Sequence, residues 1–388
     1  MDKRRLDKRI LITGGGSGGH ISAALSIISS LEEKYILDEK SFLYVGGDLG
    51  MEGEETGNSM EQKLMKDKPY NCKYIRPGKL QRNFSFNTIK LLFRTLLGLW
   101  DSYKIIKEFK PDIIISTGGF VTVHVCLVAK LFKSKIYLHE QTATVGLTNS
   151  IVGKISEKVF ISFESSKKYF KNGKTILTGN LVRSDIFNTK GQGQLAEAIR
   201  QMKELQSQYP IIYISGGGLG SHLINETVKD ALPLLLQNYQ IVLQTGENKV
   251  FNDYKTIQAI KDSLPKEMQS RFQPVTYIQG NNIGYLLNNI DLFVGRAGAN
   301  TVYEMGVLQI PSIFIPIPWV THNEQQRNAE VLVDLGLAEI VQEGELTSGC
   351  LVLKIEKFLA KQLDINREEL KRVFRTDANK LILENIGL

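Results

Sequence analysis

The chain carries the same local pattern twice, at an offset of 202 residues. Residues 12–20 (ITGGGSGGH) align with residues 214–222 (ISGGGLGSH). Each copy is a short apolar run, then a cluster of glycines, then a helical pattern, which is how a βαβ unit begins. We therefore expect two α/β domains of similar design, one for each copy.

Short apolar runs alternate with longer helical patterns along the whole chain. Most of these runs are continuously apolar, which is typical of parallel strands that helices cover on both faces. We expect strands at 10–13, 42–45, 113–116, 135–139, 159–162, 211–215, 241–245, 275–278, 292–295 and 312–315. The predicted fold class is α/β, with two Rossmann-like domains built on parallel sheets.

A polar segment separates the two halves of the chain. Residues 188–209 contain glycines and a short helical stretch but no strand-like run. The length of 388 residues agrees with two domains, at about 150 residues or somewhat more for each. We place the boundary here, with one domain at 1–187, a second at 188–374 and a final segment at 375–388.

The composition excludes several classes of protein. The three cysteines, Cys72, Cys126 and Cys350, lie far apart with no CxxC pair, so neither a disulfide framework nor a structural zinc site is expected and a reducing cytosol is the simpler location. The net charge of +7 suits an anionic substrate, a nucleic acid or an anionic membrane. Lysine and arginine are spread along the chain without a recognised nucleic-acid motif, so we expect no nucleic acid partner.

No segment predicts a membrane span. The longest uncharged stretch, 113–129, has 17 residues and contains two adjacent glycines. It is slightly short for a transmembrane helix, and we interpret it as a buried strand, a glycine turn and the start of a helix. The charged N-terminal run MDKRRLDKR is not followed by an apolar segment, so a cleaved signal peptide is not expected.

Glycine loops between a strand and a helix are typical of phosphate binding. Glycine lets the backbone approach an anion closely, and the first N–H groups of the helix then point at it. The spacing Gly14-x-Gly16-x-x-Gly19 also matches the dinucleotide fingerprint, but the acid expected about 20 residues later is displaced to Asp48. A tight turn that only packs strand against helix is the alternative for each loop.

A further glycine-rich turn, 295–301 (GRAGANT), follows a predicted strand and leads to Glu304. Small residues there would expose N–H groups at the start of a helix. Glu304, one turn later, would be placed to accept hydrogen bonds from two hydroxyl groups, such as those of a ribose. The alternative for Glu304 is a solvated carboxylate on the surface of a helix.

Taken in order, these motifs resemble the MurG family of glycosyltransferases. The resemblance covers about residues 10–338 and rests on GGGSGGH at 14–20, GGF at 118–120, HEQ at 139–141, GLTN at 146–149, GNLVR at 179–183, QTG at 244–246, RAGA at 296–299 with Glu304, and QQRNA at 325–329. It implies the GT-B architecture, in which two Rossmann-like domains face a central cleft and the last helix returns to the N-terminal domain. It implies transfer of N-acetylglucosamine from UDP-GlcNAc to lipid I, a lipid-linked muramyl-peptide, at the cytoplasmic face of the cell membrane. The product is lipid II, for peptidoglycan.

The resemblance also implies roles for single residues. The backbone of Ile278 would read the uracil, and Glu304 and Gln325 would hold the ribose. The residues expected around the diphosphate and the sugar are Ser17, Gly18, Gly19, Thr142, Arg183, Gly218, Ala299, Asn300 and Thr301. A charge-assisted contact from Arg183 suits a pyrophosphate leaving group. Thr142 stands where the family usually has an asparagine associated with the donor sugar, which leaves another donor or acceptor open.

The expected chemistry is a single inverting displacement, in which an acceptor hydroxyl attacks the donor sugar and UDP leaves. His20 is the first candidate for the base, because an unperturbed histidine titrates near pH 6.5, and Glu140 is the second. The alternatives are a histidine that orders the loop and a buried, paired acid. No Asp-x-Asp motif occurs, so we expect neither a metal ion nor another cofactor. His124 and His222 are expected to be structural.

A polyprenyl-linked acceptor implies contact with a membrane. The stretch 79–110 combines basic with large apolar residues, as an interfacial helix does. The residues expected to contact an anionic membrane surface are Phe84, Phe86, Leu92, Phe93, Arg94, Leu97 and Trp100. An ordinary core-facing helix is the alternative.

Three other functions fit part of the pattern. A related UDP-sugar transferase would use another donor or lipid acceptor, and a UDP-GlcNAc epimerase would act with no acceptor present. A NAD-dependent oxidoreductase explains only the first glycine loop. The sequence makes no prediction of the oligomeric state.

Overall fold

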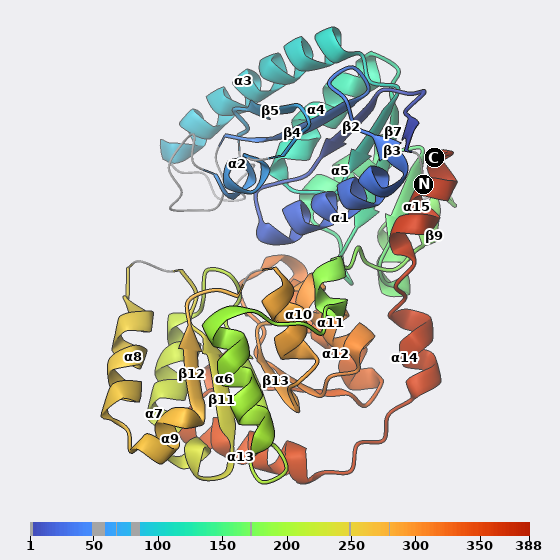
Figure 1. The fold of residues 1–388 in the computed structure, drawn as a ribbon. Coiled ribbons are helices and arrows are strands. Elements are labelled where there is room, and N and C mark those ends of the chain that lie inside the picture. The colour runs from blue at the N-terminus through green and yellow to red at the C-terminus, as the bar shows by residue number, and fades with distance from the viewer. Residues whose placement is uncertain are drawn as a thin grey trace. The chain divides into compact units, whose positions relative to one another are not determined.

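The computed structural model describes residues 3–48, 59–66, 68–78, 86–170, 173–247, 250–278 and 280–388. The chain divides into two compact units, which Figure 1 shows with all their helices and strands. The N-unit comprises Met1–Arg183 together with Arg375–Leu388, and the C-unit comprises Ser184–Phe374. Each unit is built on its own parallel sheet.

The sheet of the N-unit has seven parallel strands in the order β5-β4-β2-β6-β7-β8-β9. These strands are β2 (Ile10–Thr13), β4 (Phe42–Gly47), β5 (Cys72–Ile75), β6 (Ile113–Ser116), β7 (Lys135–Glu140), β8 (Lys158–Ile161) and β9 (Thr175–Leu177). The chain runs outward from β2 to one edge, then returns to the other side of β2 at β6. This is the doubly wound order of Rossmann-like domains, whose ligands bind at the carboxyl ends of the strands near the reversal.

The sheet of the C-unit repeats this order with six parallel strands, β12-β11-β10-β13-β14-β15. They are β10 (Ile211–Ser215), β11 (Gln240–Gln244), β12 (Phe272–Val275), β13 (Leu292–Gly295), β14 (Ser312–Phe314) and β15 (Ala338–Ile340). Here the reversal lies between β10 and β13. The two sheets confirm the predicted α/β fold of two Rossmann-like domains.

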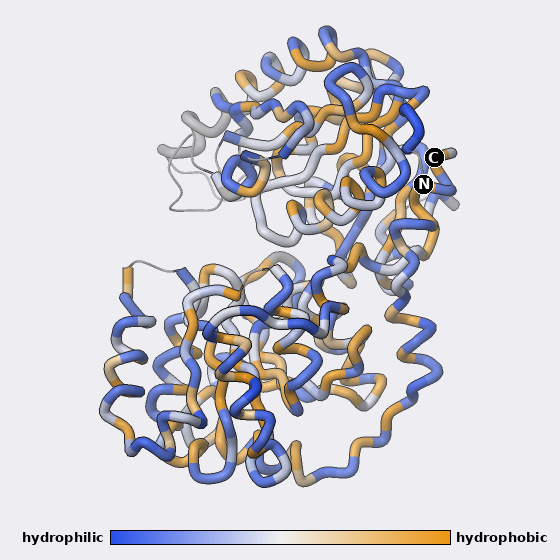
Figure 2. Tube along the Cα trace, in the orientation of Figure 1, coloured by the Kyte–Doolittle hydropathy of each residue, from blue (hydrophilic) through white to orange (hydrophobic). Residues whose placement is uncertain are grey.

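Burial on both faces explains why the strands are continuously apolar. In β2, Ile10 and Ile12 belong to one core of the N-unit, whereas Leu11, between them, belongs to the core on the other face. Successive side chains of a strand point to opposite faces, so a strand covered on both sides is apolar at most of its positions. Figure 2 shows these apolar segments along the strands inside each unit.

Helices cover both faces of the N-unit sheet. They are α1 (Gly18–Lys34), α2 (Met60–Met65), α3 (Phe86–Phe109), α4 (Phe120–Leu131), α5 (Leu147–Ile155) and α15 (Ala378–Ile386). A small additional sheet pairs β1 (Arg4–Arg5) with β3 (Tyr35–Ile36). The stretch expected as strand, glycine turn and helix is β6 followed by α4. No described helix has the length and hydropathy that crossing a bilayer requires.

The last helix, α15, is part of the N-unit core although it follows the whole C-unit in sequence. Ile382 and Leu383 are buried in the same apolar cluster as Ile10 and Ile12. The Asn379 side chain donates to Ser26 Oγ of α1 (2.9 Å), and Lys158 Nζ donates to the Asn385 carbonyl (2.8 Å). The N-unit is therefore assembled from two segments that are far apart in the chain.

The C-unit sheet is enclosed by helices in the same way. They are α6 (Gly193–Glu204), α7 (His222–Asn238), α8 (Asp253–Ser263), α9 (Lys266–Ser270), α10 (Asn281–Leu287), α11 (Ala299–Leu308), α12 (Glu324–Asp334), α13 (Ser348–Ala360) and α14 (Arg367–Val373). Short 3₁₀ turns connect other elements of the two units: η1 (Glu164–Tyr169), η2 (Ser184–Phe187), η3 (Thr321–Asn323) and η4 (Glu343–Glu345). One apolar cluster joins α7 and α13 to the strands beneath them.

One strand prediction was wrong in position. The strand expected at 275–278 is β12, which spans Phe272–Val275 and contains Pro274. Proline donates no hydrogen bond and is tolerated at the edge of a sheet, where β12 lies. The segment after Val275 instead forms a loop at the carboxyl end of the sheet. The edge strands β5, β9 and β15 were not predicted, because their partly polar sequences lack the apolar run of a central strand.

Candidate active site

The first glycine loop connects β2 to α1 at the carboxyl edge of the N-unit sheet. Ser17 is the N-cap residue of α1, but its side chain makes no capping hydrogen bond. Gly16 has a φ of +81°, in the region that glycine adopts without strain. Ser17 and Gly19 are partly buried and Gly18 is exposed, so the start of α1 borders solvent.

His20 lies in the first turn of α1 and is fixed by a reciprocal pair of hydrogen bonds. Its Nδ1 lies 2.8 Å from the Thr117 carbonyl, and the Thr117 hydroxyl donates to the His20 carbonyl (2.8 Å). A carbonyl only accepts, so Nδ1 carries the proton and Nε2 keeps its lone pair. Burial lowers the pKa of His20, and the bond to Thr117 opposes this in part. The neutral imidazole therefore has the tautomer that a base acting through Nε2 needs.

Two glycines make room for this imidazole ring. A Cβ atom at Gly118 would lie 2.8 Å from His20 Cε1, and one at Gly119 would lie 3.1 Å from Cδ2. The same atom at Gly119 would lie 1.8 Å from the Gly15 carbonyl oxygen. Both glycines also have φ above +90°. Only glycine fits here, which gives a physical reason for the GGF motif at 118–120.

Glu140 ends β7 and is held by hydrogen bonds on both oxygens. Oε1 accepts from the backbone N–H (2.9 Å) and the hydroxyl (2.8 Å) of Thr142, and Oε2 accepts from Asn149 Nδ2 (2.9 Å). Burial raises the pKa of Glu140, and these hydrogen bonds oppose the shift. Thr142 thus contacts Glu140 directly, and the Glu140 network ties β7 to α5. Whether either residue touches substrate stays a prediction.

Gln141 connects these two groups, although the sequence singled it out only as part of the HEQ motif. Its Nε2 donates to the Thr117 carbonyl (2.9 Å) and lies 3.3 Å from His20 Nδ1. The ends of β2, β6 and β7 therefore bring Ser17, Gly18, Gly19, His20, Glu140 and Thr142 to one edge of the N-unit.

The second glycine loop connects β10 to α7 in the C-unit. Gly218 is exposed at its tip, and a Cβ atom there would lie 3.6 Å from the Tyr277 ring. Ser221 is the N-cap residue, and its Oγ accepts from the Ile224 N–H (3.5 Å). A Cβ atom at Gly220 would lie 1.9 Å from the Thr245 carbonyl, so the loop packs directly on the end of β11.

Arg296 places a buried positive charge beneath the second glycine loop. Its Nη2 donates to Ser221 Oγ (2.9 Å) and its Nη1 donates to the Ile315 carbonyl (3.0 Å). Nη1 also forms an ion pair with Glu343 (2.5 Å), and both side chains are almost completely buried. The guanidinium group therefore links the start of α7 to the end of β14 and to Glu343. The sequence named Arg296 only within a motif and missed Glu343.

The residues predicted to bind the nucleotide gather at the carboxyl edge of the C-unit sheet. Ala299, Asn300 and Thr301 form the first turn of α11, after the N-cap residue Gly298, and Glu304 is buried one turn further. Gln325 Oε1 accepts from the N–H groups of Ala297 (3.3 Å) and Ile317 (3.1 Å). These backbone donors orient the carboxamide, so its NH₂ end faces the other way.

Ile278 and Arg183 are the two other residues predicted to contact the donor. The Ile278 N–H donates to Gln244 Oε1 (3.1 Å), so this N–H is already bonded within the C-unit. Gln244 was not a predicted site residue. Arg183 is the last residue of the first N-unit segment, and its side chain is partly buried. The contacts of both residues with the donor stay predictions.

The remaining histidines have structural partners or lie on the surface. His124 Nδ1 lies 3.1 Å from the Phe120 carbonyl within α4, and His139 Nε2 lies 3.1 Å from the Gly179 carbonyl. His222 Nδ1 lies 2.7 Å from Asp253 Oδ1 and its ring stacks on Phe251. With Glu226 these two form the one group of described side chains that is close enough to hold a metal ion. His322 is exposed.

The predicted membrane residues divide into three groups. Phe84 and the side chains of Phe86, Leu92 and Phe93 lie outside the described residues. Arg94 forms an ion pair with Asp48 (2.6 Å). Asp48 is the acid that a dinucleotide fingerprint would need, so its carboxylate is already paired. Leu97 is partly buried, whereas Trp100 is exposed on α3. Contact with a membrane stays a prediction for this surface.

Two doubly wound domains with glycine loops at their carboxyl edges are an architecture that glycosyltransferases use, and the chain matches two glycosyltransferase family models. Residues 10–161 match the glycosyltransferase family 28 N-terminal domain, and residues 211–383 match the glycosyltransferase family 28 C-terminal domain. The chain belongs to the MurG family of these transferases. It is 34% identical, over 98% of its length and 99% of the relative, to the UDP-N-acetylglucosamine--N-acetylmuramyl-(pentapeptide) pyrophosphoryl-undecaprenol N-acetylglucosamine transferase 2 of Bacillus anthracis.

Solved structures show how widely this fold is shared. MurG of Acinetobacter baumannii has a TM-score of 0.67 at 22% identity, covering 98% of this chain and 99% of that one. UDP-GlcNAc 2-epimerase of Methanocaldococcus jannaschii has a TM-score of 0.62 at 14% identity, covering 97% and 99%. Transferases and epimerases thus have the same architecture. The full-length sequence identity, and not the fold, separates the two activities.

Proposed function

We propose that this chain transfers N-acetylglucosamine from UDP-GlcNAc to lipid I, the undecaprenyl-pyrophosphoryl muramyl-peptide. The product is lipid II, for peptidoglycan synthesis. The observation that carries this proposal is the 34% identity to transferases of that name along 98% of the chain. Both the acceptor-side motifs of the N-unit and the donor-side motifs of the C-unit fall within the matched length.

The reaction is a single displacement with inversion at the anomeric carbon. A sugar hydroxyl of the acceptor attacks that carbon, the bond from the carbon to the UDP oxygen breaks, and UDP leaves with the bonding electrons. The hydroxyl proton passes to His20 Nε2, the ring nitrogen that the Thr117 contact leaves unprotonated. Glu140 is the weaker candidate for this base, because both its oxygens already accept hydrogen bonds inside the N-unit.

The C-unit holds the donor. UDP develops negative charge as it leaves, and the starts of α7 and α11 direct backbone N–H groups and helix dipoles at the carboxyl edge of the sheet. Arg296, which is paired with Glu343, donates to Ser221 and so fixes the start of α7. Glu304 and Gln325 bind the ribose hydroxyls, and Arg183 assists the diphosphate. No metal ion has a role in this scheme.

A UDP-release assay tests the donor and the acceptor together. Purified protein is given UDP-GlcNAc or another UDP-sugar, with and without a lipid I analogue. Release that needs both UDP-GlcNAc and the analogue supports the proposal. Conversion of UDP-GlcNAc without an acceptor indicates an epimerase, and preference for another UDP-sugar indicates a different donor, which Thr142 would then help to select.

The protein works at the cytoplasmic face of the membrane as a peripheral enzyme, and an apolar patch on the N-unit is the surface that contacts the bilayer. This apolar patch consists of Leu96, Trp100, Leu127, Leu131 and Phe132, all exposed on α3 and at the end of α4. Trp100 stacks on Tyr103, which contacts Phe132, with ring centroids 5.7 Å apart in each pair. Large apolar side chains on one exposed surface are typical of interfacial binding.

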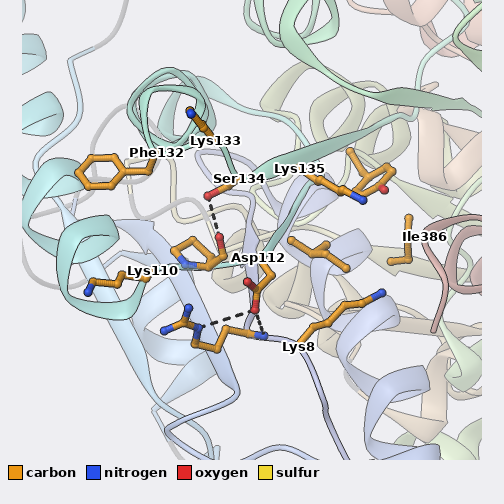
Figure 3. A pocket seen from close by; sticks show the side chains of 12 residues that line it. Lys8, Lys110, Asp112, Phe132, Lys133, Ser134, Lys135 and Ile386 are labelled. Atoms are coloured by element: carbon orange, nitrogen blue, oxygen red, sulfur yellow. Dashed lines mark hydrogen bonds and ion pairs between the residues drawn. The ribbon is translucent and has the colours of Figure 1, made fainter.

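Basic groups beside the apolar patch suit anionic lipid headgroups. Figure 3 shows a pocket of about 480 Å³ at the amino ends of β2, β6 and β7, next to Phe132. Its basic lining residues are Lys8, Arg9, Lys110, Lys133 and Lys135, against one acid, Asp112, which Arg9 contacts. Juxtamembrane basic residues each contribute about 1 kcal/mol of attraction to an anionic surface.

Vesicle binding tests this surface. Sedimentation with vesicles that contain phosphatidylglycerol is measured for the wild type, for Trp100→Ser with Leu131→Ser, and for the control Leu353→Ser, an exposed apolar residue of the C-unit. We expect the double variant to lose most binding while the control keeps it. Equal binding by all three proteins would contradict this assignment.

A further inference from the structure

A buried carboxylate occupies the first glycine loop. Glu61, in the first turn of α2, is completely buried, and its Oε1 accepts a hydrogen bond from the Gly16 N–H (2.5 Å). A Cβ atom at Gly15 would lie 2.2 Å from the same oxygen, so the loop wraps closely around the carboxylate. The amide that a glycine loop would offer to a bound phosphate is therefore taken by a side chain of the protein itself.

Three neighbouring groups fix this loop, and Glu61 is the only charged one among them. The Tyr44 hydroxyl donates to the Gly14 carbonyl (2.6 Å), and the Gly15 N–H donates to the Gly118 carbonyl (3.2 Å). Glu61 then accepts from Gly16. Gly14, Gly15 and Gly16 are thus hydrogen-bonded to β4, to the turn before α4 and to α2, respectively. The next residues are Ser17 and the first turn of α1, which carries His20.

The local structure holds Glu61 in place. Ser59 is the N-cap residue of α2, and it forms a capping box with Gln62, in which each side chain accepts from the backbone N–H of the other. The Ser59 hydroxyl also donates to the Gly47 carbonyl at the end of β4 (3.0 Å). The charge of Glu61 contributes, after burial, to raising the pKa of Tyr44 and of Tyr74, so the carboxylate lies within the electrostatic reach of both phenols.

We propose that Glu61 is a positioning residue for glycosyl transfer. Its carboxylate occupies the place at the Gly16 N–H where a bound anion would lie, and it thereby fixes the position of the first turn of α1 and of His20. The role in transfer rests on the proposed function. Because Glu61 already binds the Gly16 N–H, a phosphate of the substrate does not bind there, and an anionic group of the acceptor binds elsewhere on the N-unit. The first glycine loop then serves the base, and not a diphosphate.

Three substitutions of Glu61 test separately whether the length or the charge of its side chain matters for turnover. Glu61→Ala leaves the Gly16 N–H without this acceptor, and we expect the turnover number to fall about 100-fold, the effect of a misplacement of about 1 Å in a reacting group. Glu61→Gln keeps an acceptor oxygen at the same distance and should retain turnover within about tenfold. Glu61→Asp keeps the charge but is one methylene too short, and should resemble Glu61→Ala. The KM for UDP-GlcNAc should stay within about twofold in all three, because the groups proposed to bind its uracil and ribose lie in the C-unit.

Chemical rescue distinguishes this role from a general contribution to stability. Formate is small enough to enter the space that Glu61→Ala leaves, and it should restore turnover of that variant in proportion to its concentration without affecting the wild type. Glu33→Ala, which removes an exposed acid of α1, is the control for the loss of charge. Normal turnover in Glu61→Ala, or a loss that only follows a lower melting temperature and that formate does not reverse, would overturn the proposal.

Hydrogen exchange gives a readout that needs no substrate. In Glu61→Ala, amide exchange of the peptide covering residues 13–20 should become faster, while peptides from β6 and β7 keep their protection. Unchanged exchange in residues 13–20 would contradict the positioning role directly. If the wild type shows no transferase activity, this measurement still tests Glu61, so failure of the proposed function and failure of this inference are distinguishable.

Discussion

The two glycine loops have the same backbone design and opposite buried charges. Each follows the first strand of its main sheet and opens the helix that comes directly after that strand. Beneath the first loop lies the carboxylate of Glu61, bonded to Gly16, and beneath the second lies the guanidinium group of Arg296, bonded to Ser221. Repetition of a strand, a turn and a helix therefore does not repeat the chemistry. The second loop is suited to an anionic diphosphate, and the first to placing a neutral base.

The largest expected effect is a difference in turnover number between variants of the two histidines that occupy equivalent positions in the loops, His20 and His222. His20→Ala should lower the turnover number by about 100- to 10,000-fold, the usual contribution of a general base. UDP affinity, measured by calorimetry, should not change. His222→Ala removes the contact with Asp253 and the stacking on Phe251, and it is the matched control. Near-normal turnover of His20→Ala, or an equal loss in both variants, would remove His20 as the base.

The ion pair beneath the second loop should matter for both stability and donor binding. Arg296→Met leaves Glu343 buried and unpaired, which should destabilise the C-unit by about 3–5 kcal/mol. Adding Glu343→Gln should recover most of this loss, because no buried charge remains. The double variant should still bind UDP about tenfold more weakly, because the guanidinium donor that fixes Ser221 at the start of α7 is gone. Wild-type UDP affinity in the double variant would disprove a role of Arg296 in donor binding.

The N-unit should lose stability in mild acid. Burial lowers the pKa of His139 to about 4, against about 6.5 in the unfolded chain. Below pH 6.5 the unfolded chain takes up the proton first, so stability falls as the pH drops from 6.5 to 4, by up to about 3 kcal/mol. Urea unfolding between pH 7 and 4 measures this. His139→Asn should flatten the profile in part, because burial also lowers the pKa of His20 and of His124; an unchanged slope would contradict this account.

The smallest expected effect is a difference in stability between variants of the N-cap residues of α7 and α1. Ser221 caps α7 through its hydroxyl, whereas the Ser17 side chain makes no capping bond to α1. Ser221→Ala also removes the acceptor for Arg296 Nη2, so it should cost about 1–2 kcal/mol of unfolding free energy, and Ser17→Ala should cost clearly less. Thermal denaturation of both variants is sufficient, and an equal loss would mean that the two loops are capped alike.

Local patterns predicted the central part of each sheet. A strand covered on both faces must be continuously apolar, so β2, β4, β6, β10 and β13 are visible in the sequence. The glycine spacing then located both loops, because a close approach of backbone to its neighbours permits no side chain. Edge strands such as β5, with the sequence CKYI, are covered less completely and lack this signal.

The groups beneath the loops depend on tertiary contacts and were missed. Glu61 lies 45 residues from Gly16, and Arg296 and Glu343 meet only because β13 and the chain after β15 are folded together. The capping box of Ser59 and Gln62 was the one local signal near Glu61, since it marks the start of a helix. Leu131 and Phe132 were missed for a different reason: the pattern predicts that α4 begins in the core but does not show that its last turn emerges from it.

The position of α15 has a consequence for how the protein is made. This helix fills the core around Ile10 and Ile12, yet the ribosome adds it only after the entire C-unit. During synthesis the C-unit can complete its fold first. Until α15 is made, the N-unit has exposed apolar side chains along α1 and the sheet, where α15 later packs. A nascent chain arrested before Ala378 would expose these side chains, and chaperones would be expected to recognise the first domain for longer than the second.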